Sequence, residues 1–169
     1  SNNNKKDHIK MVMGPWSHGQ WNSAKGGKEL GEGNFGFDTS KWFQNEIQLP
    51  FFKQHLKGEK DANLATATMF ETGSNRWREF DVWPPKAAKQ QTLYLTKNEG
   101  FSAKRVDAGL SEYISDPNKP VPHSAKVSRG WDKPYMIEDQ RFAARRPDVL
   151  VFETEVLEDD FTIAGAIDL

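Results

Sequence analysis

The sequence contains no cysteine. This absence excludes a disulfide framework, a thiol nucleophile and a cysteine-ligated zinc site. Long apolar runs are also missing, because the longest span only a few residues and a bilayer needs roughly 20. The net charge is −1, with acidic and basic residues interspersed, so the charge pattern does not indicate binding to nucleic acid or to an anionic membrane. We therefore expect a soluble globular chain with neither of these partners.

Apolar and aromatic residues are plentiful enough for a folded core. They make up 36% and 12% of the 169 residues, which is typical of a globular chain. The run Ile9–Met13 ends at Gly14-Pro15, a pattern typical of a buried strand followed by a turn. A polar, glycine-rich loop then extends from Gly19 to about Phe37. The next segment predicts a helix that is capped by Asp38, Thr39 or Ser40, kinked at Pro50 and ended by Gly58.

The pattern changes after about residue 61. Alternation of apolar and polar residues predicts strands, which we place at 65–72, 76–80, 92–96, 148–154 and 161–164. Short strands separated by long loops are typical of a sandwich or jelly roll. We therefore divide the chain into residues 1–62 and residues 63–169. The first part, one strand, one loop and one helix, is too small to bury a core alone. We expect it to complete a domain that lies upstream, and we expect the second part to be incomplete.

His18 is the residue with the clearest catalytic pattern. It lies in Gly14-Pro15-Trp16-Ser17-His18-Gly19, immediately after the predicted buried strand. In α/β-hydrolases the catalytic histidine comes last in chain order, in a loop after a late strand. There it takes the proton of the serine nucleophile and later delivers it to the leaving group. By spacing alone, a histidine next to a tryptophan is more often a packed or surface residue than a catalytic one. Ser17 is not expected to be the nucleophile, because no nucleophile-elbow motif surrounds it.

Other kinds of site find little support in the sequence. No two histidines have the spacing of a metal-binding pair, and the glycine-rich loop lacks the lysine of a phosphate-binding loop. We therefore expect neither a metal nor a cofactor. Three tryptophans, Trp77, Trp83 and Trp131, are candidates for a surface that binds sugars or aromatic ligands, although core packing explains them more simply.

Several longer motifs resemble a known enzyme family. The sequence is similar to the bacterial cocaine esterase and X-Pro dipeptidyl-peptidase group, and within it most similar to α-amino acid ester hydrolases and glutaryl-7-aminocephalosporanic acid acylases. The motifs occur in the family's order over nearly the whole chain. They are Met11–Gly19, Trp42-Phe43 with Phe51–Gly58, Phe70–Arg78, Trp83-Pro84-Pro85, Asp116–Pro122 and Asp139–Leu150.

This resemblance implies a mixed fold and a reaction. The fold is the C-terminal strand–loop–helix of an α/β-hydrolase domain, followed by a mostly β, galactose-binding-like jelly roll. The reaction is the cleavage of ester or amide bonds in a small molecule through a Ser-Asp-His triad. Only the histidine, His18, falls within this chain, so its partner is the missing N-terminal catalytic portion and the isolated segment is expected to be inactive. Trp16, Trp131 and Phe142 are the residues expected to contact substrate. Residues 131–142 are candidates for closing one side of the pocket, and a purely structural role explains this loop at least as well.

Some expectations rest on the resemblance alone, and one alternative remains open. Relatives of this kind are commonly exported, so we expect a periplasmic or secreted protein that is able to form homo-oligomers. The alternative is a non-catalytic β-sandwich module that binds carbohydrate or aromatic ligands through exposed tryptophans. That reading leaves the N-terminal strand–loop–helix without a role.

Overall fold

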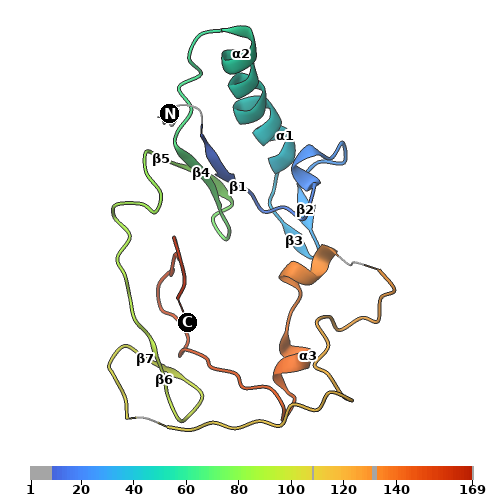
Figure 1. Ribbon diagram of the computed structural model, residues 1–169, viewed down its shortest axis with the longest axis vertical. Helices are drawn as coiled ribbons and strands as arrows, with labels where there is room; N and C mark the ends of the chain where they lie inside the picture. The colour runs from blue at the N-terminus through green and yellow to red at the C-terminus, as the bar shows by residue number, and fades with distance from the viewer. Residues whose placement is uncertain (1–8, 108, 131–132, 169) are drawn as a thin grey trace, which may run out of the picture. The chain divides into compact units, whose positions relative to one another are not determined.

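The computed structural model (Figure 1) describes residues 9–107, 109–130 and 133–168. The chain forms two compact units. Unit 1 comprises the described residues of the ranges 1–86 and 131–138, and unit 2 comprises those of 87–130 and 139–169. Unit 1 therefore extends past the boundary that we predict near residue 62. That boundary, as a division between independent domains, stays a prediction.

A three-stranded sheet forms the centre of unit 1. Strand β1 (Met11–Met13) pairs in parallel with β4 (Ala67–Glu71), and β4 pairs in antiparallel with β5 (Arg76–Phe80). The central strand β4 is the most buried, with Ala67 fully buried and Thr68 only 2% exposed. The two strands predicted at 65–72 and 76–80 are thus confirmed as β4 and β5, and the first three residues of β4 are buried on both faces of the sheet.

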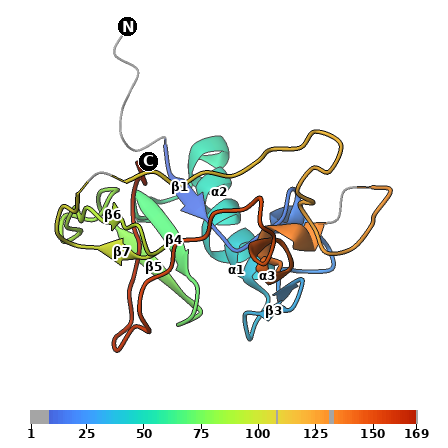
Figure 2. The ribbon, with the colours of Figure 1, turned by 90° about the horizontal axis from the view of Figure 1, so that it is seen from below.

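Between β1 and β4 in chain order lies a continuous helical rod. It consists of α1 (Thr39–Phe43), the π-helical turn η3 (Gln44–Gln48) and α2 (Leu49–Lys57). In Figures 1 and 2 this rod lies beside the β1–β4–β5 sheet. Pro50 lies in the first turn of α2, where its missing N–H costs nothing, and the wider π turn directly before it spares the carbonyl that its ring would strike. Gly58 ends α2 with φ of 67°. The predicted end at Gly58 is confirmed, whereas at Pro50 the chain stays helical on both sides, with a π turn directly before it.

The glycine-rich loop contains short elements that the sequence pattern does not reveal. They are the 3₁₀ turn η2 (Gln20–Asn22) and a hairpin of β2 (Glu29–Leu30) and β3 (Gly33–Asn34). A second 3₁₀ segment, η4 (Lys133–Ile137), also belongs to unit 1 and contacts β2. Two residues per strand are too few to give a detectable alternation, which is why the hairpin was not predicted.

Unit 2 contains fewer regular elements than its sequence pattern predicts. It contains the hairpin of β6 (Tyr94–Leu95) and β7 (Phe101–Ser102) and the short helix α3 (Arg141–Ala144). The predicted strands at 148–154 and 161–164 are wrong, because these segments form no ladder, and a strand requires a paired neighbour. Only an isolated parallel bridge joins Gly100 to Glu153. None of the helices in the described parts of the chain has the length and apolar character that would let it cross a membrane.

Candidate functional site

His18 lies in the turn that leaves the carboxyl end of β1. Its side chain is exposed, and its ring meets the edge of Trp21 with the centroids 5.9 Å apart. Neither imidazole nitrogen has a hydrogen-bond partner among the residues that the structure describes. In sheets with parallel strands, ligands bind beyond the carboxyl ends of the strands. Both ring nitrogens of His18 are therefore open to groups outside the described residues.

Buried hydrogen bonds fix the backbone on both sides of His18. On the preceding side, the Trp16 indole Nε1 donates to Thr39 Oγ1 at 2.8 Å, and the Thr39 hydroxyl donates onward to the carbonyl of Gly27 at 2.6 Å. Thr39 is completely buried. Since an unpaired buried polar group costs about 1–3 kcal/mol, this chain of bonds resists any movement that would break it.

On the following side, the side chain of Gln20 holds the turn. Gln20 Oε1 accepts from the Ser17 N–H at 3.0 Å and from the Ser17 hydroxyl at 3.2 Å, and its Nε2 donates to the carbonyl of Glu29 at 2.8 Å. The buried hydroxyl of Ser40 donates to the Gln20 carbonyl at 2.9 Å. Ser17 is only 3% exposed and its hydroxyl is already engaged, in agreement with our expectation that it is not a nucleophile.

The helix that receives these bonds begins at Asp38. Asp38 Oδ1 accepts from the N–H of Lys41 at 2.9 Å and from the N–H of Gly27 at 2.9 Å. These two backbone hydrogen bonds, that of Lys41 above all, lower the pKa of the Asp38 carboxyl. Asp38 is thus the N-cap of α1, one of the three capping residues that the sequence offered, and it also fixes the glycine turn against the helix.

Gly27 is required at this point because the chain approaches α1 too closely for any side chain. A Cβ at Gly27 would lie 2.2 Å from Ser40 Oγ and 2.6 Å from Thr39 Oγ1. Only glycine therefore allows the loop to reach the buried hydroxyls of α1. Sequence reasoning identified a glycine-rich loop here, but neither this requirement nor the hydrogen-bond chain, because both depend on contacts between residues far apart in sequence.

Trp16, which we expect to contact substrate, lies in an aromatic cluster below the His18 loop. Its ring packs against Phe43 and Trp77, with centroids 5.2 and 5.7 Å away, and Trp42 stacks on Trp77 at 4.6 Å. The cluster joins the helical rod to the sheet. Trp77 is therefore packed inside unit 1, which removes one of the tryptophans on which the carbohydrate-binding alternative depends. The substrate-binding role of Trp16 stays a prediction.

Of the predicted substrate contacts, Trp16 lies in the same loop as His18, two residues before it. Phe142 lies half-buried in α3 of unit 2, and Trp131 lies outside the described residues. Of the segment 131–142, the part that forms η4 lies in unit 1, where the Lys133 Nζ lies 3.5 Å from the carbonyl oxygen of His18. The sequence did not single out Lys133, and no local pattern marks it.

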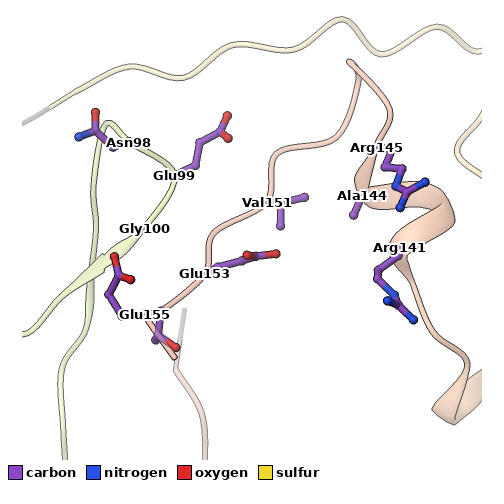
Figure 3. Close-up of a pocket in the computed structure, with 10 residues that line it drawn as sticks. Asn98, Glu99, Gly100, Arg141, Ala144, Arg145, Val151, Glu153 and Glu155 are labelled. Carbon is purple, nitrogen blue, oxygen red and sulfur yellow. The ribbon is translucent and has the colours of Figure 1, made fainter. Parts of the chain in front are cut away.

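Unit 2 contains a cavity of its own, of about 570 Å³ (Figure 3). Arg141 of α3 and Arg145, which directly follows α3, lie on one side, and Glu99 and Glu153 lie on the other. Its lining contains no histidine, serine or cysteine. No group of three or more histidine or acidic side chains within the described ranges is arranged to hold a metal ion.

Comparison with known proteins gives consistent matches. The sequence pattern of the family described as the X-Pro dipeptidyl-peptidase C-terminal non-catalytic domain matches residues 57–169. Cocaine esterase of Rhodococcus sp. (strain MB1 Bresler) is 27% identical over 172 residues, a match that covers 94% of this chain and 29% of that protein.

Two solved structures are similar over almost the entire chain. An aminopeptidase from a marine sediment archaeon, Thaumarchaeota archaeon, matches with a TM-score of 0.83 and 31% identity, over 93% of this chain and 27% of its own. An α-amino acid ester hydrolase matches with a TM-score of 0.79 and 37% identity, over 92% of this chain and 27% of its own. The chain thus spans less than a third of each of these relatives.

Proposed function

We propose that this chain is part of a serine hydrolase. The chain belongs to the cocaine esterase and X-Pro dipeptidyl-peptidase family, and its residues 57–169 match the β-rich C-terminal non-catalytic domain of that family. The reaction is the cleavage of an ester or amide bond in a small molecule through an acyl-enzyme. His18 is the base of the triad, and the non-catalytic domain is a galactose-binding-like jelly roll.

One observation carries this proposal: the exposed, unpaired imidazole of His18 on a loop that is otherwise held rigidly. General-base catalysis requires a group whose nitrogens are accessible and whose position is fixed. Buried bonds from Trp16 to Thr39 and from Ser17 to Gln20 supply the rigidity, while the imidazole itself makes no hydrogen bond to a described residue.

His18 performs two proton transfers in this scheme. Its imidazole removes the proton of the serine hydroxyl as the serine oxygen bonds to the acyl carbon. It then gives that proton to the oxygen or nitrogen of the leaving group as the acyl bond breaks, and water repeats the sequence to release the acid. The serine and the aspartate that orients His18 belong to a part of the protein outside these 169 residues, so the segment alone is inactive.

Exposed apolar surface on unit 1 supports docking of that catalytic part. In the described sheet β1 is an edge strand, and the side chains of Met11 and Met13 are 42% and 58% exposed. On α2, Leu49, Phe52 and Leu56 are also exposed, and their spacing places them on one side of the helix. An apolar strand edge beside an apolar helix is a surface that proteins normally cover. In our proposal a strand of the catalytic part pairs with β1.

The test compares two histidine variants in the full-length protein. His18→Ala is expected to lower kcat for a simple ester such as 4-nitrophenyl acetate by about 10⁴-fold, because the serine then has no base. His123→Ala, at an exposed loop position in unit 2, serves as the matched control and should leave kcat unchanged. Equal activity of the two variants would rule out His18 as the base.

A further inference from the structure

Lys133 brings a positive charge to His18 from a distant part of the chain. It is the first residue of η4, and its Nζ lies 3.5 Å from the carbonyl oxygen of His18, which is 115 residues away in sequence. Carbonyl and imidazole belong to the same residue. The ammonium therefore lies within roughly one Debye length of the ring, which is about 10 Å at 0.1 M salt.

The segment that carries Lys133 is seated against the hairpin next to the His18 loop. Segment η4 contacts β2, and at its other end Ile137 packs over Gly33. A Cβ at Gly33 would lie 3.1 Å from Ile137 Cδ1, so the Ile137 side chain can pack here because residue 33 has no side chain. Unit 1 therefore holds this end of η4 in position.

The charge of Lys133 is available to a ligand. Lys133 forms no ion pair with any carboxylate in the described ranges, and its only hydrogen bond there is the one to the His18 carbonyl. A carbonyl contact at 3.5 Å does not neutralise an ammonium. Part of the electrostatic attraction of this group is therefore left for an anion that enters beside His18.

In the proposed reaction, the group that lies beside His18 is the leaving group. The imidazole must come within hydrogen-bond reach of the leaving oxygen or nitrogen to deliver its proton. We propose that Lys133 is a specificity-determining residue that favours leaving groups bearing a carboxylate. This inference rests on the proposed function and adds to it a substrate class: esters or amides whose departing alcohol or amine is an anion.

The experiment uses two esters, 4-carboxyphenyl acetate and its methyl ester, whose leaving groups differ in that charge and in one methyl group, with the full-length protein. The measured quantity is the ratio of their kcat/KM values. Lys133→Gln is expected to lower this ratio about fivefold, as for one partly exposed ion pair, and Lys133→Glu is expected to lower it further. Added salt should weaken the preference of the wild type but not that of Lys133→Gln. The control Lys60→Gln, an exposed lysine after α2, should keep the wild-type ratio.

The readout separates specificity from support of the loop. If Lys133 only held the His18 turn in place, Lys133→Gln would slow both esters equally and leave the ratio unchanged, and that result would overturn the inference while leaving the proposed function intact. Failure of the wild type to hydrolyse either ester would overturn the proposed function and this inference with it.

Discussion

The two units differ in the sequence separation of the residues that their side-chain hydrogen bonds join. In unit 1 the buried polar side chains bond across long stretches of sequence: Trp16 reaches Thr39, 23 residues away, and Ser40 reaches Gln20, 20 residues away. In unit 2 most of the side-chain bonds are local, as between Asp139 and Arg141 or between Arg146 and Asp148, two residues apart. Long-range bonds fix the position of one segment relative to another, whereas local bonds shape only a turn.

Burial follows the same division. Unit 1 encloses apolar side chains such as Leu30, Ile47 and Met69, while in the described residues of unit 2 only Ser124 and Ala143 are buried. A preorganised site therefore has better structural support in unit 1 than in unit 2. A catalytic side chain must be held within a fraction of an ångström, and the His18 loop of unit 1 has the buried network that this demands.

The largest loss of local stability is expected at Gly27, where the glycine-rich loop contacts α1 most closely. Gly27→Ala would place a methyl group 2.2 Å from Ser40 Oγ, so the loop must move away and leave buried hydroxyls unpaired. We expect a loss of about 3 kcal/mol in the local opening free energy of this region. Hydrogen exchange of peptides that span the loop and α1 would report it.

A glycine in unit 2 provides the matched control for this substitution. A Cβ at Gly130 would meet nothing within 4 Å, so Gly130→Ala should leave exchange unchanged. Equal effects of the two substitutions would contradict the contrast between the units.

A smaller effect is expected at the helix cap. Asp38→Ala removes the acceptor for Lys41 and Gly27 and should cost about 1 kcal/mol of local stability above pH 5. The pKa of Asp38 is lower in the folded chain than the ordinary value of 3.8. Its contribution is therefore complete above that value and is lost as the pH falls through the folded pKa. Protection of the α1 amides in wild type and variant should converge at low pH, and a constant difference at every pH would count against this.

The smallest effect on stability is expected at Asp139 in unit 2. Its hydrogen bond from the Arg141 side chain lowers the pKa of Asp139 to about 2. Because both side chains are exposed, screening by solvent leaves little of this interaction as stability. Asp139→Asn should therefore leave hydrogen exchange in unit 2 unchanged. In an NMR titration Arg141→Gln should raise the pKa of Asp139 towards 3.8, and an unaltered pKa would show that the ion pair does not form.

The sequence predicted the elements that depend on local chemistry. Strand β1 follows from an apolar run with a Gly-Pro stop, but the expected burial of this strand is wrong, because Met11 and Met13 are exposed at this edge of the sheet. The cap at Asp38 and the end at Gly58 follow from what each residue does to nearby backbone groups. The strands expected at 148–154 and 161–164 failed because an alternating pattern describes a strand's faces but does not supply the partner that it must pair with.

The site was predictable only in part for a similar reason. His18 stands out by its place after a strand and by the family motif around it. Of the bonds that hold its loop, the one between Ser17 and Gln20 spans only three residues, whereas the one from Trp16 to Thr39 joins residues 23 apart, which no local pattern reveals. Lys133 is further from prediction, because its nearness to His18 depends on how a segment 115 residues away folds back.

The most direct test of the central claim, that His18 activates a serine outside this segment, is covalent labelling of the full-length protein with a fluorophosphonate. The account predicts one adduct, mapped by mass spectrometry to a serine outside residues 1–169, and its loss in His18→Ala. An adduct on Ser17, or labelling that persists in His18→Ala, would contradict the account.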